Sequence, residues 1–188
     1  MRVYCLVLVA ILGQALFCSG QEEQQKGVEA GVQFTGLHVG ELGEGAAGLG
    51  GRLGYRFLVK QARLGVETEF NYCPQNPSGN FGESQFFAGI KAGVAGQELG
   101  IFAKARPGFV RFGGADFVER NHGASTNFAF DAGGILEYYI RPHFGLRIDW
   151  GDTMIYFPDP VPTASLKSPE KAGLSHNLQG SLGLMFRL

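Results

Sequence analysis

The sequence has little cysteine, a single tryptophan and almost no net charge, and each scarcity limits the class of protein. Two of the 3 cysteines, Cys5 and Cys18, lie in the first twenty residues, so a chain without that segment keeps only Cys73 and forms no intramolecular disulfide. Lys and Arg number 16 against 17 Asp and Glu, which argues against a nucleic-acid partner. After the first twenty residues there is no apolar run of about twenty residues, the length of a membrane-spanning helix.

Glycine and aromatic residues are abundant instead. The chain has 30 Gly, 12% aromatic residues and 45% apolar residues, and few runs of strong helix formers. This composition favours strands and turns over helices. A length of 188 residues is that of one domain, so we expect a single all-β domain.

Residues 1–20 have the pattern of a signal peptide. Arg2 precedes an apolar stretch from Val3 to Leu12, and small residues precede the polar segment that begins at Gln21, so we expect cleavage after Gly20. The alternatives are a retained N-terminal anchor and a lipoprotein modified at Cys18. Phe17 disfavours the second, because a lipid-modified cysteine needs a small residue before it. We expect the folded domain to occupy residues 27–188.

From Gly27 onward, apolar and polar residues alternate with period two, which is typical of strands with two different faces. In the last such run, Leu174, Leu178, Leu182, Leu184, Phe186 and Leu188 alternate with Ser175, Asn177, Gln179, Ser181 and Arg187. The pattern predicts eight strands, at 28–39, 49–59, 62–72, 85–94, 101–109, 127–141, 143–150 and 174–188. We expect a bulge at Pro107, which has no N–H to donate.

The connections between these strands alternate between short and long. Tight turns are expected at 60–61, 96–98 and 141–143. The other connections are the longer segments VGELGEGAA, CPQNPSGNFGES, GGADFVERNHGAST and FPDPVPTASLKSPEKAG. Short turns therefore lie at one end of the sheet and four long loops at the other.

Either face of such strands can be the buried one. A soluble sandwich or lipocalin-like barrel buries the apolar face, whereas a membrane barrel turns it towards lipid. Strands of up to about 15 residues, an even strand count and glycine-rich polar faces with opposite charges favour the membrane barrel. We therefore predict an all-β, eight-stranded, antiparallel, up-and-down transmembrane β-barrel.

The charges on the polar faces are then expected to line the lumen as Arg52, Arg56, Arg63, Glu67, Glu69, Lys91, Lys104, Arg106, Asp131, Glu137, Arg147, Asp149 and Arg187. Two interpretations are open: an ion path, or a packed salt-bridge network that fills the lumen. The interior of an eight-stranded barrel is just wide enough for side chains to fill, which favours the second.

The C-terminal run has a further pattern: Ser181, Gly183, Phe186 and Leu188 follow the order polar, glycine, hydrophobic, terminal hydrophobic. This order resembles the signal by which the barrel assembly machinery recognises outer-membrane proteins, with Leu188 where phenylalanine is more common. FAKARPGFVRF (Phe102 to Phe112), FDAGGILEYYIRPHFGLRIDWGD (Phe130 to Asp152) and HNLQGSLGLMFRL resemble the small OmpA-like outer-membrane β-barrel proteins without a peptidoglycan-binding domain. The resemblance implies a fold and an outer-membrane location, with membrane lipid and the assembly machinery as partners, rather than an activity.

Catalytic and metal motifs are weak. Barrel enzymes that trim lipid A use a His, a Ser and an acidic residue on the outer face, but Ser175 and His176 are adjacent and so point to opposite faces. No acidic residue follows His176 in its strand to orient it. His38, His122, Asp116 and Glu119 lack the spacing of metal ligands. We expect no catalytic, cofactor or metal site.

Two groups of apolar residues have structural or surface interpretations. The candidates for aromatic girdles at the membrane interfaces are Tyr55, Phe57, Tyr72, Phe86, Tyr138, Phe144, Trp150, Tyr156 and Phe157. Phe81, Phe117 and Val118 lie in the long loops, where a partner can bind.

We expect a non-enzymatic protein that serves envelope integrity or surface interaction through four extracellular loops. The alternatives are a narrow pore, a lipid-modifying barrel enzyme and a soluble lipocalin-like carrier.

Overall fold

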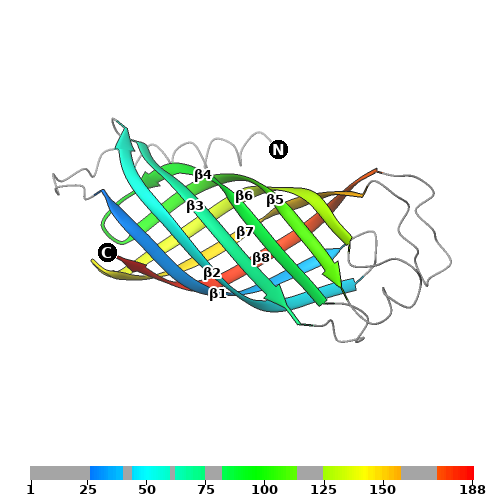
Figure 1. Cartoon of the computed structure of the whole chain (residues 1–188). Coiled ribbons are helices and arrows are strands. Elements are labelled where there is room, and N and C mark those ends of the chain that lie inside the picture. Colours follow the sequence, from blue (N-terminus) through cyan, green and yellow to red (C-terminus); the bar gives the residue numbers. More distant parts are fainter. Residues whose placement is uncertain (1–25, 40–43, 60–61, 75–81, 114–124, 158–172) are drawn as a thin grey trace, which may run out of the picture.

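The computed structural model describes residues 26–39, 44–59, 62–74, 82–113, 125–157 and 173–188. Eight antiparallel strands pair in sequence order and close into a barrel (Figure 1). They are β1 (Gly27–Val39), β2 (Glu44–Val59), β3 (Ala62–Cys73), β4 (Gly82–Ala95), β5 (Leu99–Gly113), β6 (Ser125–Arg141), β7 (Phe144–Phe157) and β8 (Gly173–Arg187). The predicted eight-stranded antiparallel barrel is confirmed. No helix among the described residues has the length and apolar character to span a membrane.

The barrel closes by pairing β1 with β8, from Glu29 opposite Arg187 to His38 opposite Leu178. Leu188 N donates to Val28 O at 2.9 Å, and Arg187 N donates to His143 O at 3.0 Å. The first and last strands therefore meet beside the connection between β6 and β7. We call this end of the barrel, with the connections at 60–61, 96–98 and 142–143, the turn end, and the opposite end the loop end (Figure 1).

Several strands extend further towards the loop end than the alternation predicts. β1 ends at Val39 and β2 begins at Glu44, so the segment expected as a nine-residue loop leaves only 40–43 between strands. Leu37 pairs with Ala46 and His38 with Gly45, because a backbone ladder does not require large side chains at these positions. The first connection at the loop end is therefore short.

The bulge expected at Pro107 is not found there. Phe87 pairs with Gly108 and Ile90 with Ala105 in the same register, so the ladder to β4 is interrupted at the proline without a shift. The register shift of the described ladders between β6 and β7 lies at Tyr139 to Arg141, beside the turn. Proline removes one ladder hydrogen bond, which interrupts pairing without adding a residue.

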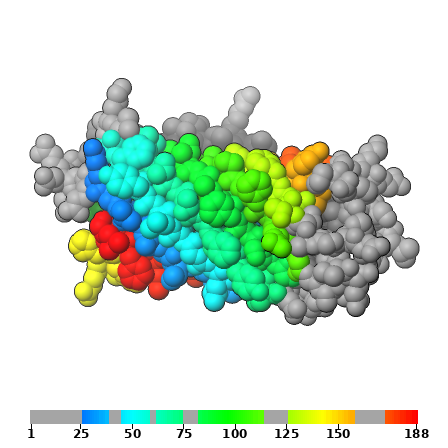
Figure 2. Space-filling view, in the orientation of Figure 1, coloured from blue at the N-terminus to red at the C-terminus, as the bar shows by residue number. Residues whose placement is uncertain are grey.

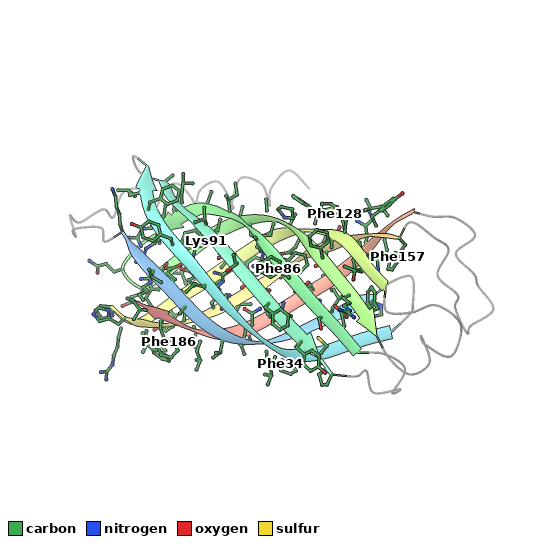
Figure 3. All side chains as sticks on the ribbon, in the orientation of Figure 1. Phe34, Phe86, Lys91, Phe128, Phe157 and Phe186 are labelled. Carbon is green, nitrogen blue, oxygen red and sulfur yellow. The ribbon has the colours of Figure 1, made fainter. Side chains whose placement is uncertain are left out.

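The two faces of each strand follow the orientation predicted for a membrane barrel. Large apolar side chains point outward, and Leu49 and Leu178 are 69% and 71% exposed. Figure 2 shows one side of the barrel's outer surface, and Figure 3 labels Phe34, Phe86, Phe128 and Phe186 among the outward apolar side chains. Charged side chains such as Lys91 lie inside, at 2% exposure. The alternative of a soluble carrier requires the apolar face to be buried, and the strands of this chain have the opposite orientation.

Candidate functional site: the barrel interior

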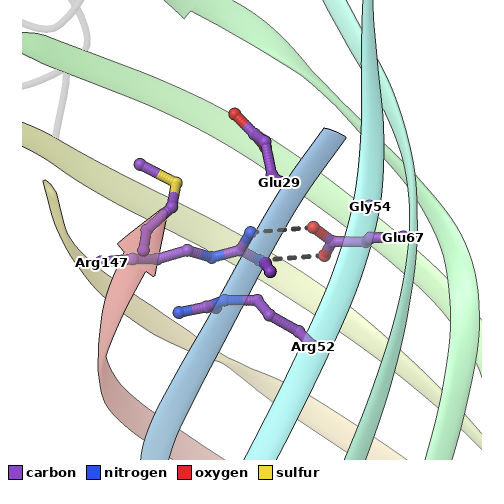
Figure 4. A pocket seen from close by; sticks show the side chains of 7 residues that line it. Glu29, Arg52, Gly54, Glu67 and Arg147 are labelled. Atoms are coloured by element: carbon purple, nitrogen blue, oxygen red, sulfur yellow. Dashed lines mark hydrogen bonds and ion pairs between the residues drawn. The ribbon is translucent and has the colours of Figure 1, made fainter. Parts of the chain in front are cut away.

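The centre of the barrel holds a network of buried ion pairs. Arg147 on β7 donates from Nη1 to Glu67 Oε2 at 2.8 Å and from Nη2 to Glu67 Oε1 at 2.9 Å, which is a two-pronged contact across the lumen to β3 (Figure 4). Its Nε donates to Asp149 Oδ2 at 2.8 Å. Arg147 is 1% exposed. An arginine fork matched to a carboxylate is among the strongest polar contacts a protein makes.

Arg106 on β5 is the second hub of this network. Its Nη1 lies 2.6 Å from Glu69 Oε2 and 3.0 Å from Glu67 Oε1, and its Nη2 lies 2.5 Å from Asp131 Oδ2. Lys104 Nζ also reaches Asp131, at 3.0 Å. Arg106 is fully buried, and of its three carboxylates only Glu69 has no other ion-pair partner among the described residues.

Arg52 crosses the barrel from β2. It donates from Nη1 to Asp149 Oδ2 at 2.9 Å. Gly31 and Gly183 make room for it, since a Cβ at either position would lie 2.9 Å or 2.8 Å from a guanidinium nitrogen. The glycines in the polar faces therefore create space for a long cation.

A second group of ion pairs lies towards the turn end. Lys91 Nζ is 2.5 Å from Glu29 Oε2 and 2.7 Å from Glu137 Oε1. Arg56 pairs with Glu29 at 3.0 Å, and Arg187 reaches Glu137 at 3.4 Å. Arg147 Nη1 lies 3.7 Å from Glu137 Oε1, which joins the two groups into one network.

The charges of this interior ion-pair network nearly cancel. Its cations are Arg52, Arg56, Lys91, Lys104, Arg106, Arg147 and Arg187, and its acids are Glu29, Glu67, Glu69, Asp131, Glu137 and Asp149. Glu83, buried nearer the loop end, accepts from Gln85 Nε2 at 2.5 Å and adds one more acid. Because buried charges are costly unless paired, the balance makes the filled lumen possible.

Amide side chains form the next layer towards the loop end. Gln33 donates to Asn71 at 2.8 Å, and Asn71 donates to Gln85 at 3.0 Å. Gln179 donates to the same Gln85 oxygen at 3.1 Å and accepts from Thr153 at 2.6 Å. This amide layer, made of Gln33, Asn71, Gln85, Gln179 and Thr153, links five strands by hydrogen bonds and leaves Gln33 Oε1 without a partner among the described residues.

An apolar cluster lies at the loop end of the lumen, beside the buried polar residues Glu83, Asn127 and Ser175. A buried cluster, which we call the apolar cap, consists of Leu37, Phe87, Val110, Phe112, Ala129, Ile155 and Phe157. The rings of Phe112 and Phe157 stack with centroids 6.0 Å apart. The lumen faces were expected to be polar and Phe157 to lie in an outer aromatic girdle; both expectations are wrong at this end, because Phe157 is buried inside. The inward positions of each strand continue to its end, even where their residues are hydrophobic.

Little free space remains among these layers. A cavity of about 10 Å³ is lined by Glu29, Arg52, Glu67, Arg147 and Met185 together with Ala30 and Gly54. That is at most the room for one water molecule. Arg52 Nε and Nη2 have no hydrogen-bond partner among the described residues, so they suit a single bridging water. Within the same ranges, no three His, Cys, Asp or Glu side chains group as metal ligands.

The structure brings together all but one of the predicted lumen charges. Arg63 points inward near the turn end and is half-buried, and it makes none of the ion pairs found among the described residues. Glu29 was not predicted to belong to the network, although its place in the alternating run from Val28 could have shown it. Tyr139 was also missed, and its hydroxyl donates to Glu137 at 2.8 Å.

Ser181 and Gly183 of the predicted assembly signal face the lumen, whereas Phe186 and Leu188 face outward, at 43% and 81% exposure. This arrangement follows from the same alternation as in the other strands. The role of the four residues as an assembly signal stays a prediction.

His176 has an acidic partner that the sequence did not reveal. Its Nδ1 lies 2.6 Å from Asp152 Oδ2 on the neighbouring strand, and both side chains are exposed on the outer face. Ser175 points into the barrel, as predicted, and donates to Asn177 at 3.0 Å. The outward neighbours of His176 on β7 and β8 are Met154, Tyr156, Leu174 and Leu178, so the described parts of these two strands place no serine or threonine nucleophile beside the pair.

Other predicted candidates lie apart from the interior or beyond the described ranges. His38 is exposed on β1. His122, Asp116 and Glu119 lie outside the described residues, as do Phe81, Phe117 and Val118.

The chain was compared with known protein families, curated sequences and solved structures. The model of the outer membrane protein β-barrel domain family matches residues 4–186. No curated protein sequence matches the chain. Among solved structures, the N-terminal β-barrel domain of OprF from Pseudomonas aeruginosa is 16% identical with a TM-score of 0.52, covering 87% of this chain and 100% of that one. Neisserial surface protein A is 16% identical with a TM-score of 0.51, covering 87% and 97%. At these identities the structural likeness concerns the fold alone.

Proposed function

The chain belongs to the family of outer membrane protein β-barrel domains, and from this premise we propose that it is a non-enzymatic outer-membrane barrel whose filled interior is a rigid support for its loop end. Its role is envelope integrity or surface interaction through the extracellular loops. The observation that carries the proposal is the closed interior, in which the ion-pair network, the amide layer and the apolar cap leave a cavity of about 10 Å³.

The filled interior disfavours a narrow pore. A hydrated ion needs a continuous polar path, whereas Phe112 and Phe157 stack across the loop end of the lumen. The charges below them are engaged with one another, so an ion would have to displace a buried pair. The working surface of the protein is therefore its outside and its loop end, where a rigid scaffold presents variable loops.

An enzymatic role has little support from the outer face. The pair of His176 and Asp152 resembles part of a catalytic triad, but its outward neighbours in the described parts of β7 and β8 carry no serine or threonine hydroxyl. Ser175, the residue next to His176 in sequence, points into the barrel and so cannot act as the nucleophile of this pair.

The test is single-channel recording with the purified barrel in planar bilayers. We expect no discrete conductance steps from the wild-type protein. Steps in the wild type that change in size in R106Q or E137Q would refute the closed interior. Outer-membrane fractions run on gels with and without boiling should show a faster band in the unboiled sample, since a closed barrel stays folded in detergent. A protein found in the soluble fraction would contradict the membrane placement.

A second experiment separates envelope integrity from surface interaction. In a host that lacks the gene, we expect increased sensitivity to bile salts or large antibiotics if the barrel supports the envelope. Complementation with a variant whose residues 158–172 are replaced by a Gly-Ser linker of equal length should restore resistance in that case. If the variant instead shows normal resistance but does not restore a surface-binding phenotype, the surface interaction is assigned to residues 158–172.

A further inference from the structure

Near the loop end, the outer surface carries four phenylalanines in one row across β3 to β6. Phe70 pairs with Phe86, Phe86 with Phe109, and Phe109 with Phe128. The rings of Phe109 and Phe128 meet edge to face with centroids 6.0 Å apart, and all four side chains are about half exposed. Aromatic side chains on the outer face of a barrel gather where the hydrocarbon of the membrane meets its headgroups. Figure 3 labels Phe86 and Phe128 of this row.

The next outward row, two residues closer to the loop end, is polar. Tyr72 pairs with Ser84, Ser84 with Arg111, and Arg111 with Thr126. Neighbouring strands lie about 4.8 Å apart, so a hydroxyl group flanks the base of the arginine on each side. Arg111 and Thr126 are exposed, and Ser84 is partly exposed. The row therefore offers a cation and two hydroxyl donors on one side of the barrel, directly beyond an aromatic row.

Arg111 has no counter-charge in the described part of the barrel. It takes part in none of the ion pairs found there, and its neighbours in sequence, Val110 and Phe112, point inward into the apolar cap. Six interior acids, Glu29, Glu67, Glu69, Asp131, Glu137 and Asp149, pair with interior cations, and the seventh, Glu83, faces inward and accepts from Gln85. An arginine at the edge of a membrane's apolar region is tolerated there and is attracted to the anionic groups of the adjacent lipids. The anion that a bilayer provides at this depth is the phosphate of a lipid headgroup.

We propose that Arg111, with Ser84 and Thr126, binds the phosphate of a membrane lipid whose acyl chains lie along the row of Phe70, Phe86, Phe109 and Phe128. The guanidinium presents forked donors that match phosphate oxygens, and the flanking hydroxyls supply further donors. This lipid site rests on the membrane placement proposed above, and it adds to that placement a particular lipid group bound at a particular position. It gives one side of the barrel, β3 to β6, a preference for lipids with an accessible phosphate.

Arg141 provides a matched control. It is also an exposed arginine, at the turn end, where Phe144 and Phe186 lie beside it, but its partners in the described ladders include no row of four phenylalanines and no serine or threonine. A general attraction between arginine and anionic lipid would act on both residues. A built site acts on Arg111 alone.

The experiment is a titration of the folded barrel, held in an uncharged detergent, with dihexanoyl phosphatidic acid, followed by backbone amide NMR. We expect saturable shifts centred on residues 84, 111 and 126. R111Q should weaken this binding by about 10-fold or more, because it removes a charge-assisted contact. R141Q should bind as the wild type does. S84A/T126A tests the hydroxyls and should weaken binding by a smaller factor.

Two further probes identify the source of the contact. Dihexanoyl glycerol, which lacks the phosphate, and inorganic phosphate, which lacks the chains, should each give no saturable shift at the same concentrations. Equal affinity of R111Q and the wild type, or equal shifts with either probe, overturns the proposal. If R111Q does not fold, R111K serves instead, with an expected loss smaller than that of R111Q but still measurable. Conductance in the wild type would refute the closed interior without touching this site, so the two proposals fail separately.

Discussion

Replacing Arg106 by methionine is the most direct test of the interior ion-pair network. Arg106 is fully buried and lies within 3.0 Å of Glu67, Glu69 and Asp131. Glu67 keeps Arg147 and Asp131 keeps Lys104 in the variant, but Glu69 has no other ion-pair partner among the described residues. R106M therefore leaves one carboxylate without its cation in a region that excludes water.

Stranding one partner of a buried pair costs about 3–5 kcal/mol, so we expect R106M to lower the free energy of unfolding by that amount. The double variant R106M/E69Q removes the stranded charge and keeps the hydrogen bond that Asn71 donates to residue 69. It should recover a large part of the loss. R141Q, an exposed position, should change the free energy of unfolding by less than about 0.5 kcal/mol.

The measurement is urea unfolding of the barrel in lipid vesicles, followed by the fluorescence of Trp150 and by the shift in gel mobility without boiling. Two-state fits give the free energy of unfolding for each variant. If R106M lies within about 1 kcal/mol of the wild type, the interior is hydrated enough to screen its charges, and the inference of a packed lumen is wrong. If R106M/E69Q is no more stable than R106M, the loss comes from packing rather than charge.

Three further predictions concern other parts of the barrel. F112A removes half of the stacked pair in the apolar cap and should lower the free energy of unfolding by about 3–5 kcal/mol; a loss below about 1 kcal/mol would show that the cap is loosely packed. Cys73 is fully buried, so a charged maleimide should not label it in the folded barrel but should label it rapidly in urea; labelling of the folded protein would reveal an open lumen. H176A should change stability by less than about 1 kcal/mol, because its contact with Asp152 is exposed, and it should leave the acyl chains of envelope lipids unaltered. A changed lipid mass spectrum on overexpression of the wild type but not of H176A would contradict the non-enzymatic proposal.

The fold was largely predictable because alternation with period two reports directly which side chains share a face. Eight such runs, with glycine and balanced charges on the polar side, gave the strand number, the closure and the outward apolar face. Most of the interior charges followed from the same pattern. The strand ends did not, because Gly45 and Ala46 continue a ladder through backbone hydrogen bonds that carry no mark in the side chains.

What the sequence could not show was which residues meet. Asp152 contacts His176 only because the register of β7 against β8 sets them side by side, and alternation carries no information on register. The apolar cap was missed for a different reason. Phe157 was expected outside because it is hydrophobic, and the expected strand ended at residue 109, before Phe112, although both positions share the parity of inward residues. Position along the strand decided their side, and their chemistry then sealed the end of the lumen.

The interior ion pairs also bear on how the barrel assembles. Arg147 and Glu67 are 80 residues apart in the chain, and Arg52 and Asp149 are 97 apart. Contacts of such separation form late, after the sheet has brought its distant strands together. During assembly these side chains therefore remain hydrated, and they exchange water for one another only as β1 and β8 meet. Closure of the sheet and drying of the lumen are then a single cooperative event, which would make the finished barrel slow to open once it has formed.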